Sequence, residues 1–153
     1  MYTKNEVSKT KQEFWTAFGL YMKPVPSSEG GRIHWQNYKT GIKGIYFRMK
    51  AERDFASIGI EIVHSDPDIR QLLFDQFKQF ERILNSTLGE SWDWQLHAAG
   101  DAGQTISKIE KRLERVNVMD ESEWGTIISF LKPRIIALDD FWSNMKYGFE
   151  GLV

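Results

Sequence analysis

The chain contains no cysteine among its 153 residues. Disulfide bridges, thiolate zinc sites, iron–sulfur clusters and cysteine nucleophiles are therefore excluded, which is typical of a protein from a reducing compartment. The N-terminal segment has no apolar signal core, and no run reaches the roughly 20 apolar residues that a membrane span requires. We therefore expect a cytoplasmic protein that makes no membrane contact.

The sequence also lacks an excess of charge of either sign. Twenty basic and 21 acidic side chains give a formal net charge of -1. No global field draws such a chain onto nucleic acid, so any contact of that kind would need a local patch. No metal box, phosphate-binding loop or activated nucleophile is recognisable, and the sequence predicts no cofactor.

The residues that are present favour one folded domain spanning positions 1–153. The hydrophobic content is 41% and the aromatic content is 14%, enough to bury a sizeable core. The segment 24–31 holds two prolines, two serines and a glycine pair, so it interrupts any regular element. We expect this segment to be the most mobile loop.

Helical periodicity and capping signals predict three helical regions. Thr3 and Glu6 have the spacing of a capping box before a helix that runs to position 23. Asp66 can cap a second helix that begins at Pro67 and carries an apolar stripe until Gly89 ends it. A third helix is expected from position 121.

The third helical region has two local signals of its own. Asp120 and Glu123 form a second capping-box pair at its start. Pro133 is expected to interrupt or kink the helix, because proline removes a backbone donor. A last helical segment should then end near Gly148.

Strand-like runs occupy 33–38, 44–51 and 55–64, and the short connections between them predict an antiparallel meander. The third run alternates apolar residues with polar ones, so one of its faces belongs to the core. Two further strands are expected at 91–97 and 105–113, although the latter also fits a helix. The fold class is therefore α+β.

The expected order is helix, three strands, helix, two strands and a broken C-terminal helix. Its simplest arrangement is an antiparallel sheet of about five strands with helices packed on one face, and a mixed sheet is the alternative. The first six elements also match the order of the restriction-endonuclease-like nuclease core. That core needs an acid and a lysine two places later on its third strand, whereas this chain has Glu61-Ile62-Val63 there and Arg48 and Lys50 on the second run.

Several segments resemble a bacterial domain family of unknown function, over most of the chain. The segments that carry the resemblance are 14–18 (FWTAF), 45–49 (IYFRM), 56–61 (ASIGIE), 132–136 (KPRII), 140–142 (DFW) and 146–149 (KYGF). The family has no established activity. Longer members that join this domain to nuclease-like modules imply an accessory role in nucleic-acid metabolism or defence.

One group of candidate residues lies on the face of the strands opposite the apolar one. Its members are Tyr46, Arg48, Lys50 and Glu61, with Trp35 or Tyr38 nearby. Aromatic rings and cations on one surface can bind a ligand or nucleic acid, since rings stack on bases and cations meet phosphates. The same pattern also fits a solvated sheet face with cross-strand ion pairs, which is the commoner explanation.

A second candidate group is His64, Asp66 and Asp68, whose side chains could bind a metal with help from Glu61 and His97. Helix capping explains the two aspartates equally well. The charged segment 108–115 could be a basic edge for DNA, but its acids weaken that field, and charged edge strands also block aggregation.

Two hypotheses follow from the sequence. In the first, the chain is a non-catalytic binding module for nucleic acid or a protein partner and is able to self-associate. In the second, it is a divergent metal-dependent nuclease that uses Glu61 and Lys50.

Overall fold

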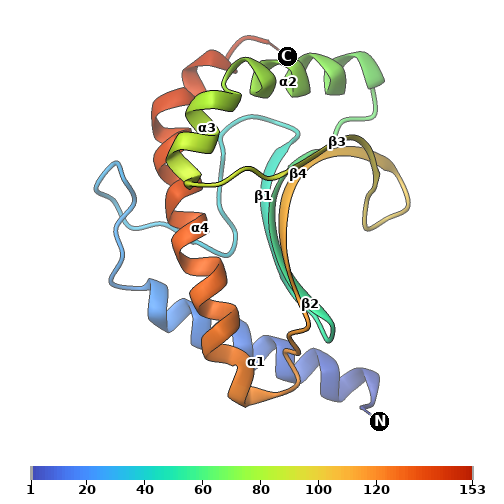
Figure 1. Cartoon of the computed structure of the whole chain (residues 1–153), viewed down its shortest axis with the longest axis vertical. Coiled ribbons are helices and arrows are strands. Elements are labelled where there is room, and N and C mark those ends of the chain that lie inside the picture. The colour runs from blue at the N-terminus through green and yellow to red at the C-terminus, as the bar shows by residue number, and fades with distance from the viewer. Residues whose placement is uncertain (1, 153) are drawn as a thin grey trace.

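The structure, a computed structural model that describes residues 2–152, is an α+β fold built on one antiparallel sheet (Figure 1). The four strands are β1 (Ile45–Ala51), β2 (Phe55–Ile62), β3 (Asp93–Ala99) and β4 (Thr105–Glu114). Their order across the sheet is β1-β2-β4-β3, and each neighbouring pair is antiparallel. The fold class is confirmed, with four strands in place of about five, and the alternative of a mixed sheet is wrong for the strands described.

The helices begin where the capping signals place them. They are α1 (Lys4–Met22), α2 (Pro67–Gln79), α3 (Glu81–Leu88) and α4 (Trp124–Met145), with short 3-10 turns at Glu121–Glu123 and Lys146–Gly148. The Thr3 hydroxyl accepts from the Glu6 amide at 3.1 Å, and the Asp66 carboxylate accepts from the Asp68 amide at 2.9 Å. Gly89 ends α3 with a φ of 72°.

Two helix predictions need correction. The apolar stripe after Pro67 belongs to two helices, because Phe80 leaves helical geometry between α2 and α3 and its ring lies 5.8 Å from that of Phe149. Pro133 does not interrupt α4, which is continuous from Trp124 to Met145. Packing of α4 against the sheet and the other helices outweighs the loss of one backbone donor.

The segment 33–38 is not a strand, contrary to the alternation in its sequence. No strand lies between α1 and β1, and the rings of Trp35 and Tyr38 are only 6.4 Å apart. A strand would direct residues three positions apart to opposite faces. The Trp35 indole donates to the Val25 carbonyl at 3.2 Å, so side-chain anchors replace a ladder of backbone hydrogen bonds in this segment.

The two faces of the sheet differ sharply. Ile58 and Ile60 of β2 are fully buried on the face that α4 covers, and Phe47 of β1 packs edge-on against Trp142 of α4. The opposite face carries polar and charged side chains, and Figure 1 shows no helix over it. The molecule therefore has helices on one side of the sheet and a bare face on the other, as the sequence predicts.

The sheet is strongly bent, and its concave side is the bare face (Figure 1). Gly59 lies at the centre of β2, opposite Arg48 of β1 and Glu110 of β4. A Cβ added at Gly59 would come within 2.9 Å of the Ile109 carbonyl oxygen. The missing side chain therefore lets the backbones of β2 and β4 approach closely where the sheet bends.

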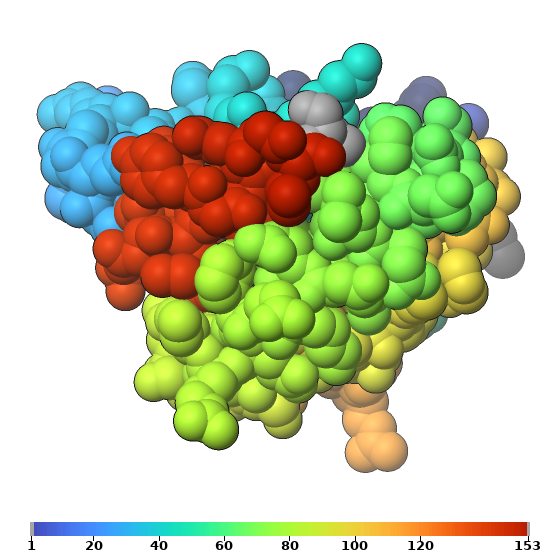
Figure 2. Space-filling model, turned by 90° about the horizontal axis from the view of Figure 1, so that it is seen from above, coloured from blue at the N-terminus to red at the C-terminus, as the bar shows by residue number. Residues whose placement is uncertain are grey.

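The C-terminal segment closes one end of the molecule. Figure 2 shows it between α2 and α3 on one side and the segment that precedes β1 on the other. The Phe77 and Phe149 rings are 4.4 Å apart, and the Gln76 side chain donates to the Gly148 carbonyl at 2.7 Å. This end is thus part of the core. Over the described residues 2–152, none of the helices combines the length and apolar character of a membrane span.

Replacing Gly59 with alanine should lower the free energy of unfolding by about 1–3 kcal/mol, because the new methyl group meets the β4 backbone. Denaturant unfolding measures the change. Gly125→Ala is the matched control, since nothing lies within 4 Å of a Cβ at that helical position, and a gain of about 0.5–1 kcal/mol is expected there. Equal effects of the two substitutions would contradict the close approach at Gly59.

Candidate functional site

The bare face of the sheet brings together four of the residues that the sequence singles out. Tyr46 of β1 lies directly opposite Glu61 of β2. Arg48 is 3.6 Å from the Glu61 carboxylate, and its guanidinium lies 4.4 Å from the centre of the Tyr46 ring. Lys50 completes the row on β1. We call these residues, with those that β4 and the β3–β4 turn add, the concave charged face.

Strand β4 and the β3–β4 turn complete this face with a second set of charges. Lys108 pairs with Glu110 at 3.5 Å, and their side chains are only 16% and 12% exposed. Asp101, in the turn that curls over the concave side, accepts from Lys50 at 2.8 Å. Three cations and three carboxylates therefore neutralise one another across the floor of the face.

Glu61 is an acid of this face whose pKa is raised above its usual value. Burial raises the pKa of its carboxyl group, and the nearby charges of Lys50, Arg48 and Lys108 offset only part of that effect. The pKa of Asp101 is lowered, mainly by its hydrogen bond from Lys50. Burial therefore dominates the pKa of Glu61, whereas pairing with Lys50 dominates the pKa of its neighbour Asp101.

Trp35 and Tyr38 do not join the concave charged face. The Tyr38 ring stacks on Phe47 with the centroids 4.9 Å apart, and Phe47 points to the helix-covered side of the sheet. Trp35 is buried in the core. The sequence could not place these two residues, because they lie in an irregular segment whose side chains follow no strand alternation.

The candidate metal ligands serve local backbone structure. Asp66 caps α2, and the ring nitrogen Nδ1 of His64 accepts from the Asp66 amide at 3.1 Å. Across residues 2–152, no three side chains among histidine, aspartate and glutamate converge as a metal-binding group. The set of His64, Asp66 and Asp68 is therefore not assembled as a site.

The charged segment 108–115 belongs largely to β4, an inner strand. Because β4 lies between β2 and β3, the expectation of a basic edge strand is wrong. Its alternate charged residues face the concave side, where Arg112 pairs with Glu114 at 2.9 Å, while Lys111 lies opposite the buried Ile58 on the helix-covered face. The segment therefore extends the ion-paired face and does not add a separate basic patch.

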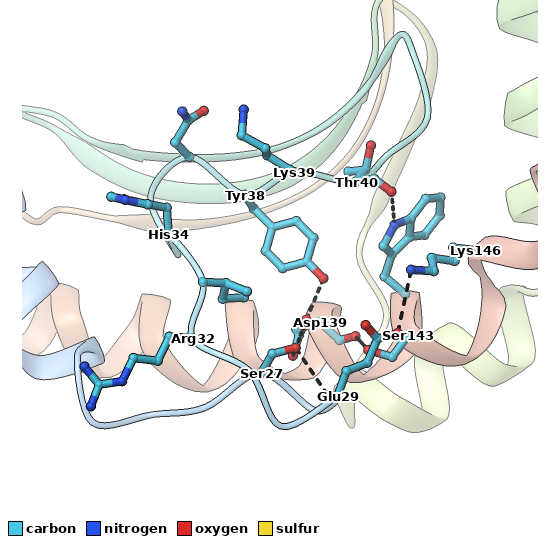
Figure 3. A pocket seen from close by; sticks show the side chains of 13 residues that line it. Ser27, Glu29, Arg32, His34, Tyr38, Lys39, Thr40, Asp139, Ser143 and Lys146 are labelled. Carbon is cyan, nitrogen blue, oxygen red and sulfur yellow. Dashed lines mark hydrogen bonds and ion pairs between the residues drawn. The ribbon is translucent and has the colours of Figure 1, made fainter.

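A second feature, which the sequence did not reveal, surrounds Asp139 in the middle of α4 (Figure 3). This side chain is only 2% exposed. Its carboxylate accepts from the Tyr38 hydroxyl at 2.5 Å, from the Ser28 amide at 2.7 Å and from the Ser27 hydroxyl at 3.2 Å. Burial and the bond to this carboxylate raise the pKa of Tyr38, since both disfavour the phenolate.

The Asp139 bonds fasten two irregular segments to α4. Ser27 and Ser28 belong to the segment 24–31, and Tyr38 belongs to the one that follows it. The Ser28 hydroxyl also donates to Ser143 at 3.0 Å, one helical turn after Asp139. We call Asp139 and its partners Ser27, Ser28 and Tyr38 the Asp139 latch. One sequence signal could have indicated it, because an aspartate between the core positions Leu138 and Trp142 breaks the apolar pattern of the helix.

Comparison with known proteins identifies the family. The chain belongs to a family described as a domain of unknown function, DUF4268, whose model matches residues 10–146. Neither a curated protein nor a solved structure matches the chain. The resemblance to a domain family of unknown function is thus confirmed, and the family adds no activity to the geometry.

Replacing Asp139 with alanine should lower the free energy of unfolding by about 1–3 kcal/mol, because the Tyr38 hydroxyl and the Ser28 amide lose their partner. Denaturant unfolding measures the loss of free energy. Faster hydrogen exchange of the Ser28 amide would show that the loss arises at this contact. Asp140→Ala is the control, since Asp140 is exposed on the same helix and should change stability by less than about 0.5 kcal/mol. Equal losses in both variants would contradict the latch.

The free energy of unfolding of a Glu61→Gln variant, minus that of the parent protein, should increase as pH rises. The folded-state pKa of Glu61 is raised, so ionising this group costs more in the folded protein than in the unfolded chain. The parent therefore loses stability as pH rises from the unfolded pKa through the folded one, and the variant does not. Urea unfolding over roughly pH 4 to pH 8 tests this difference.

Glu114→Gln removes an exposed carboxylate from the same face and serves as the control for that pH series. Its stability should follow that of the parent protein across the range. A Glu61→Gln variant whose stability relative to the parent falls as pH rises would show that the three neighbouring cations outweigh burial.

Proposed function

We propose that this domain is a non-catalytic binding module with an accessory role in nucleic-acid metabolism or defence, and that the concave charged face is its recognition surface. One observation carries the proposal. The helices of the described chain all pack on the other side of the sheet, and this face stays bare while its charged side chains are already ordered in mutual ion pairs.

The order within this face favours recognition. Side chains that are held before a partner arrives lose less conformational entropy on binding. Glu61 sits beneath Arg48 and Lys50, and Lys108 and Glu110 are held beside it. Tyr46, which is 39% exposed, stands above this network. Tyrosine and arginine are enriched among the residues that anchor protein interfaces, and Tyr46 lies beside Arg48.

The charge balance of the face favours a protein partner over nucleic acid. Each cation of the network already has a carboxylate within 3.6 Å. A phosphate backbone would have to compete with these carboxylates and would meet their negative charge. A protein segment with both acidic and basic side chains can instead extend the existing pairs. The accessory role therefore operates through a protein contact.

The geometry gives less support to the nuclease alternative. Magnesium-dependent cleavage needs several oxygen ligands around the metal and a cation near the scissile phosphate. Glu61 faces three cations, and the Lys50 ammonium is bonded to Asp101. The order of elements also departs from that of the nuclease core, since the first predicted strand is irregular. Binding without catalysis is the function that the arrangement supports best.

Photo-crosslinking from position 46 tests the proposal. A photoreactive phenylalanine analogue replaces Tyr46 in the full chain, which is irradiated in cells of the organism that produces it. We expect a discrete covalent complex with a protein, and its yield should fall when Arg48→Ala is added, because the anchor loses its supporting guanidinium.

The same analogue at Tyr147 is the matched control, since Tyr147 is more exposed but lies in the C-terminal 3-10 turn, away from the sheet face. Complexes that form equally from both positions, or adducts to nucleic acid alone from position 46, would contradict a protein-binding face.

A further inference from the structure

A pocket of about 330 Å³ lies between α4 and the segment 27–40, away from the concave charged face. Its volume is at the lower end of the range for small-molecule sites. Figure 3 shows the Tyr38 hydroxyl directed toward Asp139 of α4, with Ser143 and Lys146 further along the helix. The pocket shares none of its lining residues with the concave charged face.

Hydrogen bonds and ring stacking hold the walls of this pocket in place. The Asp139 latch fixes the Tyr38 hydroxyl, and stacking on Phe47 holds one face of the Tyr38 ring. The Trp142 indole donates to the Thr40 carbonyl at 2.7 Å, which fixes the opposite wall. A cavity whose walls are fixed in advance costs little conformational entropy to fill.

The cations of the lining do not supply positive charge to the interior of the pocket. Figure 3 shows the Arg32 and Lys39 side chains directed away from the cavity, and both residues are exposed. Solvent therefore screens their charges. Lys146 does approach the cavity, but its ammonium pairs with the Glu29 carboxylate at 3.6 Å, so its charge is already balanced.

Asp139 is a buried charge of the lining that no cation compensates. The residue is 2% exposed, and none of the ion pairs within residues 2–152 includes it. Its donors are the hydroxyls of Ser27 and Tyr38 and the amide of Ser28, all of them neutral groups. A buried carboxylate is usually paired with a cation, because the loss of its hydration is otherwise poorly compensated.

The Asp139 carboxylate also has room for one more donor. The two oxygens of a carboxylate can accept about four hydrogen bonds. The latch supplies three donors, and the Ser27 hydroxyl shares its single proton between both oxygens at 3.2 Å each. Asp139 is among the residues that line the pocket. An uncompensated negative charge with an unused acceptor position therefore borders a small cavity.

We propose that this pocket binds a small organic molecule through a protonated amine. The ammonium group donates to the Asp139 carboxylate and supplies the positive charge that this carboxylate lacks. The face of the Tyr38 ring that does not stack on Phe47 adds a cation–π attraction. A protonated amine suits the site better than a quaternary ammonium, because only the former has N–H groups to donate.

This site does not depend on the proposed function of the sheet face. Tyr38 packs on the helix-covered side of β1, whereas the protein contact would use Tyr46 on the other side. Loss of one binding activity by substitution should therefore leave the other unchanged. The two proposals can succeed or fail separately.

An NMR titration of the purified, isotope-labelled full chain at neutral pH tests the inference. The amine probes are butylamine, putrescine and phenethylamine, and neutral butanol and anionic butyrate are the comparison probes. We expect the amines to shift the signals of the Ser28 amide and the Trp142 indole, which border the pocket. Butylamine should bind at least about tenfold more tightly than butanol, the gain expected from one charge-assisted hydrogen bond. The order of the three amines tells which kind of molecule carries the amine.

Asp139→Asn removes the charge but keeps the size of the side chain and one acceptor oxygen. The affinity for the amines should fall at least about tenfold. Asp140→Asn is the matched control, because it makes the same change of charge at an exposed position of α4 outside the pocket lining. Its affinity should equal that of the parent protein. The amide spectrum of each variant shows whether it folds.

Lys146→Ala should have the opposite effect, and it leaves the bonds of the Asp139 latch in place. It removes the cation that approaches the cavity and releases Glu29, so the affinity for the amines should rise roughly two- to fivefold. This variant decides the question if Asp139→Asn does not fold. The proposal is overturned if no amine binds, if butanol binds as tightly as butylamine, if Asp139→Asn loses no more affinity than Asp140→Asn, or if Lys146→Ala does not strengthen amine binding.

Discussion

The helices must cover the apolar face of the sheet, and the ion pairing on its opposite face follows from that constraint. In β2 the fully buried Ile58 and Ile60 alternate with Ser57 and Gly59, so only one side of the strand can join an apolar core. Burial of the apolar side against α4 contributes the main stabilising term. The polar side is then left without a covering layer. Its charged residues reduce their exposure by pairing with one another along a bent sheet.

A single buried carboxylate organises the part of the chain that has no regular structure. Residues 23–44 form no helix or strand beyond the end of α1, so their polar groups need partners elsewhere. Asp139 supplies acceptors for the hydroxyl and amide donors of Ser27, Ser28 and Tyr38. The same bonds shape the pocket beside α4. The latch and the pocket are therefore one structural feature, and both depend on a residue from the far end of the sequence.

The sequence predicted the features that depend on neighbouring residues. Capping at Thr3 and Asp66, the left-handed end at Gly89 and the alternation of β1 and β2 are short-range effects, and the structure confirms them. The break at Phe80 and the continuous helix through Pro133 depend on tertiary packing, which local propensity does not describe. The strand predicted at 33–38 was wrong because Trp35 and Tyr38, three positions apart, both pack against the core.

The candidate sites were predictable to a similar extent. Alternation placed Tyr46, Arg48, Lys50 and Glu61 on one face, and cross-strand pairing brought them together. The β3–β4 turn, whose Asp101 neutralises Lys50, could not be foreseen because its path over the face depends on the bend of the sheet. The partners of Asp139 were equally hidden, since more than 100 positions separate that residue from Tyr38.

We propose that this domain binds a protein partner and performs no cleavage. A titration of the purified chain with labelled DNA and RNA tests this proposal, over a series of salt concentrations, with magnesium present and the strands analysed for breakage. We expect intact strands and weak binding, because the cations of the sheet face are already paired. Magnesium-dependent cleavage that disappears in the Glu61→Gln variant would contradict it.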